Sequence, residues 1–214
     1  MSDMVLRVLP VGPLQTNAYL LTCSGEAMLV DPGDEPETLL DAISDSGCRL
    51  SSLLCTHGHF DHVSAAAAIQ QQWDVPLLCH EFDAEVIQRM PTVQSAYGFP
   101  PSAIPRLERV LQDGSNLNFA DHELQVVHVP GHSPGHIMLI LGSDVLVGDC
   151  VFQGSIGRTD LPGGNFSILE QSIQLKIYSL PDNSVLHPGH GPATTVEAEK
   201  RANPFVRPLP DLAN

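Results

Sequence analysis

Short apolar runs alternate with turn-forming and helix-forming stretches along the whole chain. In the first half, apolar and alternating residues predict strands at 5–9, 18–23, 27–30, 52–55 and 76–79. Between these runs, a proline-led stretch, a stretch rich in alanine and glutamine, and a third polar stretch predict helices at 36–45, 63–73 and 81–90. The first half therefore mixes strands with helices.

The second half repeats this mixture after a proline-rich segment. Residues 91–106 contain Pro91, Pro100, Pro101 and Pro105, which predict a long surface segment that acts as a lid or as a plain connection. Strands are then predicted at 109–111, 116–119, 124–129, 137–141, 145–147 and 185–186. Helices are predicted at 166–179 and 195–202.

This order of elements favours a layered α/β fold with largely antiparallel sheets. It disfavours a doubly wound parallel sheet. No internal repeat and no low-complexity linker divides the chain. We therefore expect a single domain over residues 1–214, with a substantial core.

The composition of the chain indicates its cellular compartment and limits the classes of partner that it can bind. No apolar run approaches the ~18 residues needed to cross a membrane, and no signal peptide is evident at the N-terminus. The five cysteines form no C-x-x-C pair, which is typical of reduced, buried thiols, so a cytoplasmic location is predicted. A net charge of −15, with 10 Lys and Arg residues against 25 acidic ones, argues against a nucleic-acid partner.

The chemistry concentrates in seven side chains that suit divalent cations. Four fall within one short motif, Thr56-His57-Gly58-His59-Phe60-Asp61-His62. Three follow singly in turn-like contexts, and they are His132, Asp149 and His190. Zinc and similar cations prefer imidazole nitrogen and carboxylate oxygen, so this set predicts a site for two cations. The remaining histidines are interpreted as structural or surface residues: His80, His122, His128, His136 and His187.

These residues resemble the metallo-β-lactamase superfamily, whose motif H-x-H-x-D-H is followed by separate His, Asp and His residues. The resemblance covers nearly the whole chain. It implies an αββα four-layer sandwich with the metal site at one edge of the two sheets. Within the superfamily the chain is similar to the glyoxalase II group (hydroxyacylglutathione hydrolases) in its short bacterial form. That similarity depends on Gly148-Asp149-Cys150 and on the segments 154–164, 189–195 and 199–205.

The resemblance also implies how the ligands divide. It gives one cation to His57, His59 and His132, and the other to Asp61, His62 and His190, with Asp149 bridging them. The cations would be zinc, with iron or manganese as alternatives. True β-lactamases of the superfamily commonly carry cysteine at the Asp149 position and are exported, so this chain is not expected to hydrolyse antibiotics. Longer glyoxalase II enzymes have an added helical domain that contacts glutathione, and here few residues follow His190.

The expected reaction is hydrolysis of a thioester, most simply S-lactoylglutathione, to glutathione and a 2-hydroxy acid. Two cations ~3.5–4 Å apart can share a hydroxide that attacks the carbonyl, and Asp61 would orient it. Arg158 is the candidate contact for a substrate carboxylate; its alternative role is a salt bridge with Asp160 or a part in fixing its loop. Tyr97 and Phe99 would line the mouth of the site or serve only in packing.

Other functions of this superfamily remain open. A persulfide dioxygenase would hold a single iron on His57, His132 and Asp149. A phosphodiesterase, nuclease or lactonase is a weaker alternative, because the charge disfavours nucleic acid. A non-catalytic binding module would not need all seven ligands. Oligomeric state and native metal are not fixed by the sequence.

Overall fold

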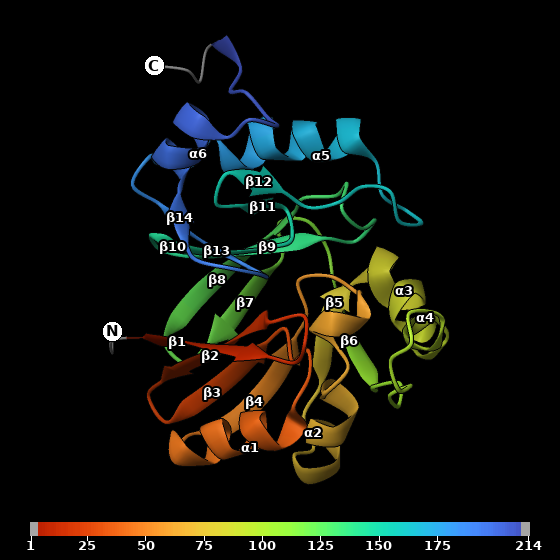
Figure 1. Ribbon diagram of the computed structural model, residues 1–214. Helices are drawn as coiled ribbons and strands as arrows, with labels where there is room; N and C mark the ends of the chain where they lie inside the picture. The colour runs from red at the N-terminus through yellow and green to blue at the C-terminus, as the bar shows by residue number, and fades with distance from the viewer. Residues whose placement is uncertain (1–3, 211–214) are drawn as a thin grey trace.

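The computed structural model describes residues 4–210, which form four layers in the order helices, sheet, sheet, helices (Figure 1). The first sheet takes its six strands from the first half of the chain: β1 (Val5–Val11), β2 (Thr16–Cys23), β3 (Glu26–Val30), β4 (Arg49–Leu54), β5 (Leu77–His80) and β6 (Leu107–Leu111). The expected αββα sandwich is therefore confirmed.

The second sheet takes its strands from the second half. Its order is β14-β13-β10-β9-β8-β7, with bounds β7 (Asn116–Phe119), β8 (His122–His128), β9 (Ile137–Leu141), β10 (Asp144–Gly148), β13 (Val185–Pro188) and β14 (Thr194–Thr195). A separate small hairpin, β11 (Val151–Phe152) with β12 (Ser155–Ile156), follows β10.

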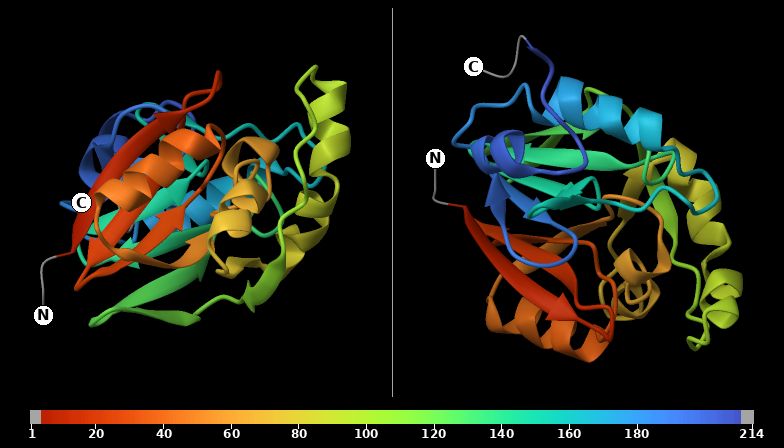
Figure 2. Two further views of the ribbon diagram at one scale, coloured as in Figure 1. Left: turned by 90° about the horizontal axis from the view of Figure 1, so that it is seen from below. Right: turned by 45° about the horizontal axis from the view of Figure 1, so that its top comes forward.

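Helices cover the outer face of each sheet, as the two further views show (Figure 2). The first half contributes α1 (Pro36–Asp45), α2 (Ala66–Gln72), α3 (Ala84–Gln88), α4 (Met90–Ala96) and the 3₁₀ turns η1 (Phe60–His62) and η2 (Glu81–Asp83). The second half contributes α5 (Phe166–Ser172), the π-helical continuation η3 (Ile173–Ile177) and α6 (Val196–Ala202).

Three apolar cores lie between the four layers. Leu39 and Ile43 of α1 pack with Leu29 and Leu53 on the outer face of the first sheet. Tyr19, Phe119 and Leu139 are among the residues that fill the space between the sheets. Leu169, Ile173 and Val196 cover the second sheet. Full burial of a Leu or Ile side chain contributes roughly 1.5–3 kcal/mol, so these cores fix the mutual position of the sheets.

Part of the first sheet pairs in parallel, whereas the sequence predicts largely antiparallel sheets. β1, β2 and β3 pair antiparallel, but β3, β4, β5 and β6 pair parallel to one another. Each parallel step is connected by a helical segment across the outer face of the sheet, which is the usual requirement for parallel neighbours. The second sheet is antiparallel except for the pair β10 and β13.

Several predicted helix limits were wrong. The helix expected at 81–90 is a 3₁₀ turn followed by the short α3, and the helix expected at 63–73 starts later, at Ala66. The segment 91–106 is not one long loop, because α4 occupies its first part up to Ala96. Pro91 sits in the first turn of α4, where a missing backbone N–H costs no hydrogen bond. Residues 97–106 form no helix or strand.

Candidate metal centre

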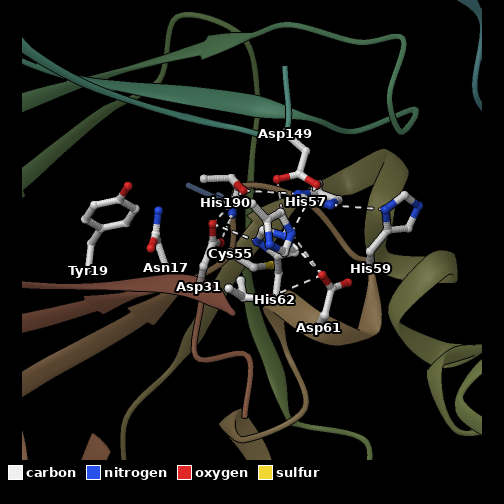
Figure 3. A network of polar contacts seen from close by, with 12 residues as sticks. Asn17, Tyr19, Asp31, Cys55, His57, His59, Asp61, His62, Asp149 and His190 are labelled. Atoms are coloured by element: carbon white, nitrogen blue, oxygen red, sulfur yellow. Dashed lines mark hydrogen bonds and ion pairs between the residues drawn. The ribbon is translucent and has the colours of Figure 1, made fainter. Parts of the chain in front are cut away.

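The seven predicted ligands converge at one edge of the sandwich, between the two sheets. Each lies just after a strand: the His57–His62 motif after β4, His132 after β8, Asp149 after β10 and His190 after β13. Figure 3 shows Asp149 extending from the second sheet toward the histidines of the first half. The spacing in the sequence therefore did predict a shared location.

A first group consists of three imidazoles. His57 Nε2 lies 3.1 Å from His59 Nδ1 and 3.2 Å from His132 Nε2. Nitrogens that bind one zinc tetrahedrally at ~2.0–2.1 Å are themselves about 3.3 Å apart, so these separations suit one cation. We call these three residues the all-histidine group.

A second group combines one carboxylate with two imidazoles. Asp61 Oδ2 lies 3.2 Å from His190 Nε2 and 3.6 Å from His62 Nε2. The three donor atoms lie within 4.8 Å of one another, which a single cation can span. We call Asp61, His62 and His190 the mixed group.

Asp149 lies between the two groups. Its Oδ1 is 3.4 Å from His62 Nε2, and its Oδ2 is 3.6 Å from His132 Nε2 and 3.5 Å from His190 Nε2. One carboxylate thus faces ligands of both groups, which is the geometry that a bridging carboxylate needs.

Among the described residues, four buried side-chain atoms have no hydrogen-bond partner, and two of them are candidate metal donors that face each other. These two are His62 Nε2 and Asp149 Oδ1. Buried polar atoms nearly always have a hydrogen-bond partner, so two facing atoms that lack one need an explanation. A divalent cation between them would satisfy both atoms, and the donor set of nitrogen and carboxylate oxygen fits zinc or a similar metal.

Two imidazoles of the all-histidine group, His57 and His59, have lowered pKa values. Burial lowers the pKa of His57 well below its usual value, and His62 and His59 add to the effect. Burial also lowers the pKa of His59 to about 4, with a contribution from His132. His57 and His59 are therefore unprotonated near neutral pH and offer lone pairs.

The mixed group behaves in the opposite way. Burial alone would lower the pKa of His62, but the charges of Asp149, Asp31 and Asp61 raise it well above its usual value. Burial likewise opposes protonation of His190, yet contact with Asp61 and the charge of Asp149 raise its pKa. A cation arriving here has to displace protons.

The carboxylates of the centre are held as anions. Burial raises the pKa of Asp149, but His62 and His132 outweigh burial and leave it well below its usual value. The pKa of Asp61 is also lowered, because His62 and His190 outweigh its burial. Both carboxylates are therefore charged at neutral pH and available as ligands.

Asp31 positions His62, and the sequence interpretation missed it. Its Oδ2 lies 3.0 Å from His62 Nδ1, and both side chains are fully buried. The same carboxylate accepts hydrogen bonds from the backbone N–H of Thr56 at 2.7 Å and from the Thr56 hydroxyl at 2.8 Å. A carboxylate behind a ligating histidine directs the other ring nitrogen toward the metal. Its location directly after β3, at the same edge as the ligand loops, was the available signal.

Asp83 joins the two loops of the all-histidine group, and it was also missed. Its Oδ2 accepts hydrogen bonds from the backbone N–H of Gly58 at 2.7 Å and from the Ser133 hydroxyl at 2.7 Å. Its Oδ1 accepts one from the backbone N–H of Gly135. Gly58 was expected to permit a bend; the structure gives a further reason, since a Cβ there would lie 2.9 Å from the Asp83 carbonyl oxygen.

Other backbone contacts fix the single ligands. His132 Nδ1 lies 2.8 Å from the Arg158 carbonyl oxygen, which leaves Nε2 facing His57. The backbone N–H of Asp149 donates to His136 Nε2 at 2.9 Å, so this histidine, predicted to be structural, supports the centre directly. His187 contacts Asp144 at 2.7 Å and belongs to neither candidate ligand group, which agrees with the structural or surface role predicted for it.

The His190 loop is held by side chains from the other sheet. Asn17 Nδ2 donates to the carbonyl oxygens of Pro188 at 2.9 Å and Gly191 at 2.8 Å, and the Tyr19 hydroxyl donates to Pro188 at 2.6 Å. A Cβ on Gly189 would overlap the Asp149 carboxylate and the His62 ring, so glycine is needed there. Figure 3 shows Asn17 and Tyr19 beside the ligands.

The predicted substrate residues have mixed outcomes. Arg158 forms a two-contact salt bridge with Asp160, at 2.8 Å for both hydrogen bonds, which was the alternative role considered for it. Its side chain is 55% exposed beside the centre, so a substrate role stays a prediction. Tyr97 and Phe99 pack on Phe60, with ring centroids 6.4 and 5.1 Å away.

Fold and site together define a metal-dependent protein of the αββα class. A family model described as the metallo-beta-lactamase superfamily matches residues 11–190, and the chain belongs to this superfamily. No helix within residues 4–210 is long and apolar enough to span a bilayer.

Curated relatives agree over nearly the full length. The chain is 36% identical over 208 residues to hydroxyacylglutathione hydrolase GloC of Haemophilus influenzae, covering 95% of this chain and 98% of the relative. It is 35% identical over 204 residues to the probable metallo-hydrolase YqgX of Bacillus subtilis, covering 94% and 96%. The GloC match supports the resemblance to the glyoxalase II group.

Solved structures show the same fold. The crystal structure of TTHA1623 in a di-iron-bound form matches with a TM-score of 0.87 and 41% identity, over 94% of this chain and 100% of that one. The BLEG-1 B3 metallo-beta-lactamase matches with 0.88 and 34%, over 94% and 99%. ETHE1 from Myxococcus xanthus matches with 0.81 and 25%, over 94% and 84%.

Proposed function

We propose that this protein is a two-metal hydrolase of thioesters that acts on S-hydroxyacylglutathione, such as S-lactoylglutathione. The observation that carries the proposal is the pair of ligand groups, with donor atoms 3.1–3.6 Å apart and Asp149 between them. The GloC relative, at 36% identity, supports the choice of substrate class.

The all-histidine group would hold one cation and the mixed group the other, with Asp149 shared. Zinc is the first choice, and the same donors also accept iron or manganese. Residues from both halves of the chain complete the site, so we treat residues 1–214 as a single functional domain. The five cysteines form no disulfide within residues 4–210, which suits a reducing compartment such as the cytoplasm.

The bound cations would supply an activated water and stabilise negative charge on the thioester carbonyl oxygen. Asp61 would orient that water. Its carboxylate is anionic, and the Thr16 hydroxyl donates to Asp61 Oδ2 at 3.3 Å, which leaves Oδ1 for another partner. The departing thiolate comes from a thiol with a pKa of ~8.5 and needs no acid to help it leave.

Arg158 would bind a carboxylate of the glutathione moiety. Its guanidinium already pairs with one carboxylate in the two-contact geometry that it would use for substrate. Binding would therefore exchange Asp160 for a substrate carboxylate at an exposed position.

A persulfide dioxygenase with one iron is the second candidate. It is favoured by the His57–His132 contact at 3.2 Å and the His132–Asp149 contact at 3.6 Å, which together form a two-histidine, one-carboxylate set. The complete mixed group beside this set argues for the two-metal reading.

The test combines metal analysis of freshly purified protein with three assays on the same sample. We expect close to two metal ions per chain and rapid cleavage of S-lactoylglutathione. Oxygen consumption with glutathione persulfide by iron-loaded protein holding one metal per chain would replace the proposal with the second candidate. Hydrolysis of a chromogenic β-lactam faster than of any thioester would instead overturn the expectation against antibiotic hydrolysis.

A further inference from the structure

A small cavity opens beside the mixed group. The candidate metal-binding side chains do not fill it. Its volume is about 150 Å³, and its walls come from the β1–β2 connection, the start of η1 and the segment after α4. Five water volumes of ~30 Å³ would fill it, so it admits a group of a few heavy atoms and not a tripeptide.

The cavity wall is also a support for two ligands. The Leu14 carbonyl oxygen lies 3.1 Å from His190 Nδ1, and the Thr16 hydroxyl donates to Asp61 Oδ2. Leu14, Thr16 and Asp61 all line the cavity. A group bound there is therefore adjacent to the atoms that would act on a thioester carbonyl.

Most of the wall is apolar. Val11, Leu14, Phe60 and Phe99 line it, and the Phe60 and Phe99 rings pack with centroids 5.1 Å apart. Buried apolar surface of this kind favours an apolar group over water by ~25 cal/mol per Å².

The polar groups at the cavity are engaged with each other. Gln94 is 3% exposed; its amide nitrogen donates to the hydroxyls of Ser64 and Ser102, and its oxygen accepts from the Ser102 backbone N–H. The charged side chains among the lining residues are both acidic, Asp34 and Asp61. An acyl group with its own carboxylate would meet the negative charge of Asp34 there, and no Lys or Arg side chain lines the cavity to offset it.

The β1–β2 connection is fixed in place. The Gly12 backbone N–H donates to Glu35 Oε1 at 2.9 Å, and the Gln15 side chain donates back to the Gly12 carbonyl oxygen at 2.8 Å. The cavity is thus preformed, and its size limits what can enter.

We propose that this cavity binds the acyl side chain of the thioester, and that it selects short, uncharged acyl groups. The inference rests on the proposed thioester hydrolysis, in which water adds to the carbonyl carbon and the C–S bond breaks, giving the acid and the free thiol. The glutathionyl part, which carries two carboxylates, lies outside the cavity on the side of Arg158.

Three variants test the cavity with a panel of glutathione thioesters. Leu14→Trp fills it from a position whose side chain is 43% exposed, Phe99→Ala enlarges it, and Asp34→Asn removes one negative charge. Leu175→Trp, at an exposed site on η3, is the matched control. The panel is S-lactoyl-, S-mandeloyl- and S-succinylglutathione, with lactoyl-coenzyme A to vary the thiol.

We expect Phe99→Ala to raise kcat/KM for the mandeloyl ester relative to the lactoyl ester by about tenfold, since pocket contacts of one or two carbons are worth that much. Leu14→Trp should shift the same ratio in the opposite direction. Asp34→Asn should raise the succinyl-to-lactoyl ratio several-fold, and Leu175→Trp should leave every ratio unchanged.

Two results are decisive against the inference. In the first, the variants leave the kcat/KM ratios between acyl groups unchanged but alter the kcat/KM ratio between the glutathione and coenzyme A esters. The cavity would then bind the thiol part of the substrate and not the acyl group. If wild-type protein cleaves thioesters but no variant changes any ratio, the cavity has no role in selection. A wild-type protein that cleaves no thioester overturns the proposed function and this inference together.

Discussion

The two ligand groups differ in charge and in exposure, although they lie side by side. The all-histidine group contains imidazoles whose pKa burial lowers, and His57 and His132 are only 1% and 2% exposed. In the mixed group the pKa values of His62 and His190 are raised by carboxylates, and the His190 side chain is 28% exposed. The first group has two unprotonated imidazoles, His57 and His59, whereas the second already contains paired charges that a cation must rearrange.

This difference suggests a division of tasks. With His57 and His59 unprotonated, the all-histidine group can hold a cation with little rearrangement. The mixed group opens to solvent and to the cavity, and it contains Asp61, the carboxylate proposed to orient the attacking water. Four predictions test how far the two groups act separately, in order of decreasing effect.

The largest effect is expected from Asp149→Ala, because this side chain belongs to both groups. Loss of a shared ligand removes several kcal/mol of charge stabilisation, so kcat/KM for the thioester should fall on the order of 10³-fold or more. Metal content measured by plasma mass spectrometry should fall in parallel. Full activity in this variant would contradict the bridging role and the comparison built on it.

Substitution of Asp83 should weaken the all-histidine group alone. Asp83→Ala and Asp83→Asn should both lower metal affinity by roughly 10–100-fold, the usual effect of removing a support behind ligands. Asn has the same volume as Asp, but its amide presents an N–H group to the backbone donors that Asp83 accepts from. If Asp83 served only for packing, Asp83→Asn would keep the wild-type metal affinity. Competition with a chelator measures the affinity, and Asp144→Asn is the control. Release of both metals together would argue against separate groups.

Arg158→Ala should leave both groups intact, because His132 contacts the backbone carbonyl of this residue and not its side chain. Exposed ion pairs contribute under ~1 kcal/mol, so KM should rise about fivefold or less while kcat and metal content stay constant. Steady-state kinetics, with Arg49→Ala as an exposed control, would reveal this. A loss in kcat with unchanged KM would refute the substrate contact.

Mild acidification should release about one metal ion per chain, the ion of the mixed group, before the all-histidine group loses its ion. A raised pKa means that His62 and His190 bind protons at higher pH than free histidine does, so protons compete for the mixed group first. His59, whose pKa is about 4, stays unprotonated until the solution is much more acidic. Dialysis at stepwise lower pH, followed by metal analysis, should show stoichiometry passing from two to one. Simultaneous loss of both ions would contradict the difference.

Local pattern sufficed for most strands and for the proximity of the candidate ligands. The apolar runs predicted the strands of both sheets to within a few residues, except β14, whose Thr195 was assigned to a helix. The histidine motif and the single ligands were predicted to converge, and they lie together because each follows a strand. The short β11–β12 hairpin was missed, since strands of two residues give no periodic pattern. α4 was missed because Pro91 was interpreted as a break, whereas it occupies the first turn of the helix.

The supports of the site could not be derived in the same way. Asp83 is 25 positions from Gly58 and 52 from Gly135, and its partners are mainly backbone N–H groups that every residue but proline has. No residue type in the sequence marks such a pairing. Asp31 is an intermediate case, because its position after a strand pointed to the right edge but not to His62.

The division of the sheets along the chain gives the metal centre a mechanical meaning. The first sheet is made from residues before β7 and the second from β7 onward, so the polypeptide passes between them only once. The motif from His57 to His62 belongs to one half, and His132, Asp149 and His190 to the other. The halves thus meet as two subunits of a dimer would, with the candidate ligands at their interface, and each bound ion would be a cross-link that joins the halves without a covalent bond.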